Sequence, residues 1–154
     1  VYASVAATLA LHFAGYVVVL AALRATGEPV HLIGLVLALP LWALMALAVT
    51  GIALALSALQ VFVRDVEHVL MPLLMMLMYL TPILYPLSLV PGSLKPWVAA
   101  NPFTWLVDRL RAALLEGRLA PEPGDLVALG VAVALFLAGR WVFRRLSPYF
   151  EDFV

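Results

Sequence analysis

Residues 32–63 read LIGLVLALPLWALMALAVTGIALALSALQVFV and contain no charged side chain. At about 1.5 Å of rise per helical residue, about 20 mostly apolar residues cross a hydrocarbon core of roughly 30 Å. This stretch is longer than one perpendicular crossing requires. We therefore expect a membrane helix that tilts, bends near Pro40 or projects beyond the bilayer.

The composition of the whole chain agrees with a membrane protein. Of its 154 residues, 66% are hydrophobic and 12% are charged, whereas a soluble domain is about half apolar and about a quarter charged. The formal net charge is zero and cysteine is absent. Neutrality argues against nucleic-acid binding, and the lack of cysteine excludes disulfides, thiol nucleophiles and thiolate metal sites.

Three further stretches predict membrane helices, at residues 1–23, 69–85 and 126–143. Together with the stretch at 32–63 they predict an all-α integral membrane protein with four transmembrane helices. A broken re-entrant segment and an amphipathic helix complete the prediction, and all of it forms a single transmembrane domain over residues 1–154.

Small residues predict which sides of two of these helices are packed, because they let helix backbones approach closely in lipid. In the second stretch the expected packing side carries Gly51, Ala55 and Ser57. In the last stretch it carries Gly130, Ala134 and Ala138.

Prolines interrupt the third stretch and the residues that follow it. They are Pro72, Pro82, Pro86, Pro91, Pro96 and Pro102. An interior proline removes a backbone donor and clashes with the preceding turn. We therefore expect a helix over about 69–85, followed by irregular backbone in a re-entrant and amphipathic region over about 87–117. Such backbone is tolerated at membrane depth only inside protein or beside water.

An amphipathic helix is predicted inside that region. Asn101 is a suitable N-cap with Pro102 at the first helical position, and Gly117 fits a helix stop. The apolar residues that share one face are Phe103, Leu106, Val107, Leu110 and Leu114. The helix should lie at the membrane interface or pack under the broken segment.

Charged residues of this helix are expected largely outside the apolar face. Arg109 and Arg111 can pair there with Asp108 and Glu116. In the next loop, Asp125 is a possible N-cap of the last membrane helix.

A charged hairpin, Arg64-Asp65-Val66-Glu67-His68, separates the second and third stretches. So many charges cannot lie in hydrocarbon, so this segment must reach a membrane surface. Four crossings put both chain ends on one side, and the cluster of Arg140, Arg144 and Arg145 favours the cytoplasm for that side. The raw count of basic residues points the other way, with five outside against four inside.

No phosphate loop, dinucleotide fingerprint, zinc-protease motif or nucleophile elbow occurs in the sequence. Methionines cluster between Met71 and Met78, and Met75 and Met78 could line a deformable pathway or simply face lipid. The aromatic residues around the proline-rich break form either an interfacial belt or a set of faces on which sugar rings stack. They are Tyr79, Tyr85, Trp97, Phe103 and Trp105.

Two histidines have open interpretations. His12 lies within the first span, where it is either a functional group or, as we favour, a neutral imidazole bonded to a neighbouring helix. His68 beside Glu67 lacks the spacing of a metal site and is interpreted as a solvated loop residue, so no metal is expected.

Several motifs in order resemble the permeases of ABC-type polysaccharide exporters, which include those of O-antigen, capsule and teichoic acid. They are LSALQVFVRDV at 56–66, YLTPILYP at 79–86, Val90-Pro91, Asn101-Pro102-Phe103 and RAALLEG at 111–117. Thr81 differs from the family pattern, in which serine usually precedes this proline.

The resemblance implies a membrane subunit with six spans that works as a homodimer with two copies of a separate cytoplasmic ATPase. Val1 is not an initiator Met, and the chain is expected to be truncated and to hold the third to sixth spans. The segment that contacts the ATPase would precede it. No cofactor is expected on this chain, since ATP and magnesium would bind the partner.

The resemblance also implies roles for particular residues. Arg64 and Asp65 lie in a cytoplasmic hairpin, and Tyr79 and Tyr85 match the channel side. Met75 and Met78 are further channel candidates. The candidate residues of a re-entrant outer gate are Pro82, Pro86, Pro91, Trp97, Asn101, Pro102 and Phe103.

The function expected from the resemblance is export, without catalysis, of a lipid-linked polysaccharide or teichoic acid. The cargo would move from the cytoplasm to the outer face of the bacterial inner membrane. Export of drugs or small lipids is an alternative. An intramembrane glycosyl- or acyltransferase is another, with Asp108 and Glu116 or Glu67 and His68 as its acid–base pair. A structural assembly subunit is the third.

Overall fold

The computed structural model describes residues 1–27, 33–63, 65–83, 85 and 87–152. Their order is α1 (Tyr2–Ala25), α2 (Ile33–Phe62), α3 (Val66–Leu80), η1 (Leu87–Leu89), α4 (Lys95–Ala100), α5 (Pro102–Leu115), α6 (Pro123–Leu146) and η2 (Ser147–Asp152). Within these residues the fold is entirely helical, as predicted.

Three of the described helical stretches are long and apolar enough to cross a membrane: Tyr2–Ala25, Ile33–Phe62 and Pro123–Phe150. They correspond to the first, second and last predicted spans. The helix α3 is apolar but has only 15 residues, fewer than the roughly 20 that a perpendicular crossing needs. A fourth span is therefore not confirmed.

The predicted helix over 69–85 has different bounds, because α3 begins at Val66 and ends at Leu80. Thr81 takes an extended conformation with φ −99° and ψ 124°. This follows from Pro82, since the ring of a proline disfavours the helical region for the residue before it. Pro72, in contrast, lies within α3 without ending it.

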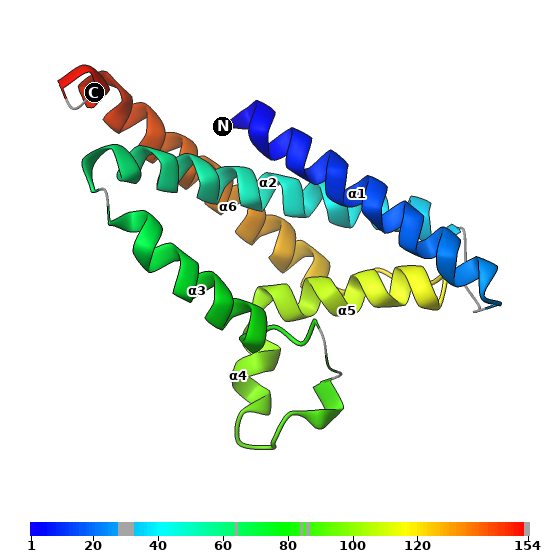
Figure 1. The fold of residues 1–154 in the computed structure, drawn as a ribbon. Coiled ribbons are helices and arrows are strands. Elements are labelled where there is room, and N and C mark those ends of the chain that lie inside the picture. The colour runs from blue at the N-terminus through cyan, green and yellow to red at the C-terminus, as the bar shows by residue number, and fades with distance from the viewer. Residues whose placement is uncertain (28–32, 64, 84, 86, 153–154) are drawn as a thin grey trace.

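The helices α2 and α6 form the centre of the structure and run in the same direction (Figure 1). Gly51 and Gly139 bring their backbones together. A Cβ atom on Gly139 would overlap the Gly51 carbonyl oxygen, and one on Gly51 would overlap the Leu135 carbonyl oxygen. Only glycine permits this approach.

The predicted packing sides are half correct. Gly51 lies at the contact as expected, whereas Ala55 and Ser57 are half-buried and Leu54 and Ala58 are the buried residues of the following turns. On α6, however, Ala132 and Gly139 are buried, whereas the expected packing residues Gly130, Ala134 and Ala138 are exposed. The small residues on this helix occupy two sides, and the one facing α2 is not the one predicted.

The helix α5 packs across the other end of α2, where Gly34 approaches the backbone of Ala113 and Leu114. Leu41, Leu106 and Ala113 form a buried cluster between the two helices. The amphipathic helix is thus confirmed, and it packs against α2.

The helix α1 lies along α2, held by an aromatic cluster of Phe13, Tyr16 and Trp42. The ring centroids of Phe13 and Trp42 are 5.6 Å apart in an edge-to-face arrangement. In contrast, α3 has no buried residue and diverges from the other helices (Figure 1).

Candidate functional site

Several of the predicted gate residues lie at or beside the break after α3. Thr81 and Pro82 are buried there, although α3 itself is exposed. The backbone after Thr81 leaves the helical path, so its polar groups need partners other than the α3 turn. Two side chains of the α5 segment, Asn101 and Arg111, supply contacts to this region.

Asn101 joins the break to the start of α5. Its Nδ2 atom donates a hydrogen bond to Thr81 Oγ1 at 3.0 Å, and its Oδ1 atom accepts one from the Phe103 backbone N–H at 3.0 Å. The predicted N-cap is therefore confirmed. The same amide also links two motifs that lie twenty residues apart in the sequence.

Arg111 holds the backbone on the other side of Pro82. Its Nη2 atom donates hydrogen bonds to the carbonyl oxygens of Pro82 at 2.9 Å and Ile83 at 2.8 Å. Its Nη1 atom lies 3.5 Å from Asp108 Oδ1, which confirms the predicted pair. Arg111 thus supplies donors to carbonyl groups of the irregular backbone that follows α3.

A further hydrogen bond fixes the corner between α4 and α5. The Thr104 hydroxyl donates to the Val98 carbonyl oxygen at 2.7 Å, and both residues are buried. Pro102 occupies the first turn of α5, where its missing N–H costs nothing. We call Thr81, Asn101, Thr104 and Arg111 the hairpin network, because their side chains hold α3, α4 and α5 together.

Three of the candidate aromatic residues lie around one hollow beside this network. A cavity of about 340 Å³ is lined by Tyr79, Tyr85, Trp97 and Pro91, among others. The Tyr85 hydroxyl donates to the Tyr79 carbonyl oxygen at 2.6 Å. Tyr79 and Trp97 are 65% and 74% exposed, so their ring faces are accessible.

Other candidate residues lie elsewhere. Met75 and Met78 are exposed on α3 and do not line that hollow. Phe103 lies instead in an apolar cavity between α2, α5 and α6. Asp65 is the residue before α3 and is exposed, with no capping hydrogen bond from its side chain. The predicted roles of Arg64 and Pro86 concern positions outside the described residues.

The two histidines differ from their predicted surroundings. His12 Nδ1 lies 2.7 Å from the Thr8 carbonyl oxygen of its own helix, so the expected partner on a neighbouring helix is wrong. His68 lies in the first turn of α3 and not in a loop, although it is exposed as expected. In the part of the chain that the structure describes, no group of three acidic, cysteine or histidine side chains could hold a metal.

A buried ion cluster around Arg109 was not predicted from the sequence. This side chain was expected on the polar side of α5, yet Arg109 is only 7% exposed. Its guanidinium lies 3.0 Å from both Glu122 Oε1 and Asp125 Oδ2, and it also donates to the Ala120 carbonyl oxygen at 2.6 Å. The cluster therefore ties α5 to the first turn of α6.

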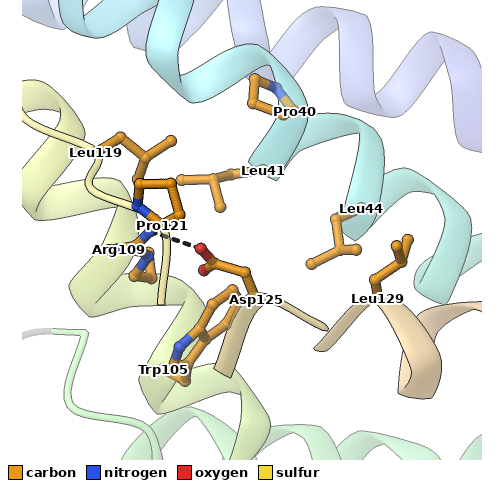
Figure 2. Close-up of a pocket in the computed structure, with 9 residues that line it drawn as sticks. All are labelled: Pro40, Leu41, Leu44, Trp105, Arg109, Leu119, Pro121, Asp125 and Leu129. Carbon is orange, nitrogen blue, oxygen red and sulfur yellow. Dashed lines mark hydrogen bonds and ion pairs between the residues drawn. The ribbon is translucent and has the colours of Figure 1, made fainter. Parts of the chain in front are cut away.

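The prediction that Asp125 is the N-cap of α6 is wrong. The N-cap is Glu122, and Asp125 is the third helical residue of a capping box in which its Oδ2 atom accepts the Glu122 backbone N–H at 2.8 Å. Figure 2 shows the Asp125 carboxylate turned toward Arg109, beside Trp105. The Arg109 guanidinium carbon lies 5.9 Å from the centre of the Trp105 ring, within the range of a cation–π contact.

These observations define a helical membrane protein. Its two central helices are α2 and α6, and the break after α3 is held by polar side chains of the hairpin network. The family model described as ABC-2 type transporter matches residues 1–115. The chain belongs to the ABC-2 type transporter family.

Within this family, the chain is similar to permease proteins of O-antigen export systems. The chain is similar to the O-antigen export system permease protein RfbA of Myxococcus xanthus, with 33% identity over 100 residues that cover 63% of this chain and 38% of the relative. A Klebsiella pneumoniae protein of the same name is 26% identical over 102 residues, covering 66% and 39%. The chain thus spans less than half the length of these relatives.

Proposed function

We propose that this chain is part of the membrane subunit of an ATP-driven exporter of lipid-linked polysaccharide, located in the inner membrane of a bacterium. It acts as a homodimer with a cytoplasmic ABC ATPase, which binds ATP and magnesium and carries out the hydrolysis. The cargo moves from the cytoplasm to the outer face. Support comes from the family, the names of the relatives and the hairpin network.

The observation that carries the proposal is the meeting of three separate motifs at one break in the chain. Thr81, Asn101 and Arg111 come from different motifs of the polysaccharide-exporter resemblance, and they are joined through hydrogen bonds at the buried Pro82. A backbone break held by side chains is a suitable element for a gate, because these bonds can exchange partners without unfolding a helix.

The exposed rings beside the network suit a sugar polymer. Tyr79, Tyr85 and Trp97 present apolar faces with polar edges around one hollow. Neither Lys nor Arg nor a carboxylate lines that hollow among the described residues. A neutral aromatic surface holds each sugar ring weakly, so a long chain can slide from one contact to the next.

The decisive experiment is depletion of the full-length protein in its own bacterium, with measurement of surface polymer and of polymer attached to the lipid carrier inside the cell. Export predicts that surface polymer falls several-fold while carrier-linked polymer accumulates. Unchanged surface polymer would contradict the proposal. Accumulation of a small lipid or drug in its place would favour the other cargo class.

A variant pair tests the aromatic hollow. Replacing Tyr79 and Tyr85 together by alanine should lower polymer export several-fold without changing expression or dimer formation. The matched control is Tyr2→Ala, an exposed tyrosine at the start of α1 that does not line the hollow. Normal export in the double variant would assign both rings to an interfacial belt.

Reconstitution separates transport from the remaining classes. The full-length protein with its ATPase should hydrolyse ATP faster when lipid-linked polymer is present. A transferase would instead modify the polymer without ATP, and a purely structural subunit would leave hydrolysis unaffected by polymer.

A further inference from the structure

A groove between α2, α5 and α6 has a polar end and an apolar end. Its polar end is a cavity of about 330 Å³ beside Arg109 and Asp125 (Figure 2). Its apolar end is a second cavity of about 280 Å³. Leu44 and Trp105 line both cavities, so the two adjoin.

The polar end is lined by Arg109 and Asp125 and holds buried donors and an acceptor that lack hydrogen-bond partners. One guanidinium, Arg109, faces two carboxylates, Glu122 and Asp125. Among the described residues, Arg109 Nε, Trp105 Nε1 and Asp125 Oδ1 are buried without a hydrogen-bond partner. Two N–H donors and one carboxylate acceptor that remain unpaired each cost free energy. A ligand with both an anionic and an N–H-bearing group would satisfy both kinds.

The apolar end has the composition of a site for a hydrocarbon chain. Its lining includes no charged residue among those described, and α6 contributes Ala128, Val131, Ala132 and Leu135 to it. Asp125 lies in the first turn of α6. From Asp125 to Leu135 the helix rises about 15 Å.

The direction of this polarity matches a bilayer. The helix α6 belongs to a stretch that is long and apolar enough to cross the membrane. Its charged first turn therefore belongs near the interface, and its later turns belong in hydrocarbon. The groove changes from polar to apolar along the same turns of α6. A phospholipid changes in the same order, from its headgroup to its acyl chains.

We propose that this groove binds a membrane phospholipid whose headgroup carries a primary ammonium, namely phosphatidylethanolamine. The ammonium N–H groups donate to Asp125 Oδ1, the phosphate accepts from Arg109 Nε, and one acyl chain lies along α6 in the apolar cavity. A headgroup of net negative charge is disfavoured because the cluster already carries a net negative charge. A choline headgroup lacks the N–H that the carboxylate needs.

The site is independent of the exported cargo, since it requires only that the helices lie in a membrane. A lipid in this position would contact both α5 and α6. It would thereby stabilise the packing of α5, the helix that carries Thr104 and Arg111 of the hairpin network. It would act as a structural component of the protein.

The test is native mass spectrometry of the purified full-length protein with phosphatidylethanolamine, phosphatidylcholine or phosphatidylglycerol, without ATPase or polymer. We expect phosphatidylethanolamine to bind at least tenfold more tightly than the other two lipids. Equal affinity for all three, or preference for the anionic lipid, would overturn the proposal. These outcomes leave the export proposal unaffected, because neither transport nor hydrolysis is measured.

Two variants locate the lipid. Ala128→Phe fills the apolar cavity and Asp125→Asn removes the negative charge that attracts the ammonium. Each should weaken phosphatidylethanolamine binding about tenfold, with unchanged helix content. The matched control is Ala134→Phe on an exposed side of the same helix, which should bind like the wild type. Equal binding by Ala128→Phe and the control would place the lipid elsewhere and contradict the site.

Competition distinguishes the other occupants. A lipid-linked polymer that displaces phosphatidylethanolamine from the wild type would assign the groove to cargo, and loss of lipid on dimerisation would assign it to a second copy of the chain. Either result would overturn the proposal. Retention of the lipid in both experiments supports it.

Discussion

The two ends of α2 pack on helices that are themselves held in different ways. Near its end at Phe62, α2 packs on α6 through glycines and apolar side chains, with Gly51 against Gly139. Near its beginning, α2 packs on α5, a helix with a hydrogen-bonded cap, a buried arginine and a bond to a broken segment. Both helices meet α2 itself through a glycine and apolar side chains. Only α5 is also held by polar side chains, which bond it to the break after α3 and to the start of α6.

This difference has a physical reason. Continuous helices satisfy their own backbone hydrogen bonds, so in lipid they need only close packing to associate. The chain around Pro82 has left the helix, and its carbonyl groups need other donors. Polar side chains therefore concentrate at the break after α3, and under the proposed function these are the contacts that would change during transport.

The largest effect is expected at the glycine contact. Gly139→Leu places a side chain where the Gly51 backbone lies, and it should lower the free energy of unfolding by about 3 kcal/mol, at the upper end of ordinary overpacking. Thermal unfolding of the full-length protein in detergent measures this. Gly130→Leu is the control, because a Cβ there meets nothing within 4 Å. Equal loss in both variants would show that the contact does not decide stability.

The sequence predicted the three long apolar helices but not which of their sides meet. Uncharged length and proline positions determine where helices begin and end, and Pro82 contained the information that α3 stops at Leu80. The side of α6 that faces α2 was mispredicted because small residues occur on both sides of this helix. Whether Gly130 or Gly139 faces α2 depends on the surface of α2. The sequence of α6 alone does not contain that information.

The site was partly predictable for a similar reason. Asn101 is followed directly by proline, so its role as a cap is a local signal. Burial of Arg109 is not local, because its partners Glu122 and Asp125 lie 13 and 16 residues away, across a loop. The one available signal was the pair of carboxylates at the start of a membrane helix, close enough along the chain to reach an arginine of the preceding helix.

A smaller effect on stability is expected at Asn101, one of the polar side chains that hold α5. Asn101→Ala removes the cap of α5 and leaves the buried Thr81 hydroxyl without its donor. Together these changes should lower the free energy of unfolding by about 2 kcal/mol. Asn101→Ser keeps a capping oxygen but is too short to reach Thr81, so it should cost about 1 kcal/mol. Equal loss in both variants would mean that the Thr81 bond contributes nothing.

Arg111 should affect local motion more than overall stability. Its side chain is 35% exposed, so Arg111→Ala should lower the free energy of unfolding by only about 1 kcal/mol. The amides of Thr81 and Ile83 should nevertheless exchange hydrogen several-fold faster, because two carbonyl contacts that hold this segment are lost. Hydrogen exchange with mass spectrometry measures this. Arg118→Ala, at an exposed position after α5, should leave those amides unchanged. Unchanged exchange in Arg111→Ala would remove this residue from the hairpin network.

The smallest effect is expected for Tyr85→Phe, and it separates two roles of one residue. The change removes the hydroxyl that donates to the Tyr79 carbonyl oxygen but keeps the ring. Because Tyr85 is half-buried, loss of this hydrogen bond should lower the free energy of unfolding by about 0.5 kcal/mol. If ring faces carry the polymer, export should stay close to wild type in Tyr85→Phe while the double alanine variant loses it. A loss of export equal to that of the double variant would instead show that the hydroxyl, by closing the turn after α3, is what the gate requires. The aromatic hollow would then belong to the same hydrogen-bonded support as Asn101 and Arg111.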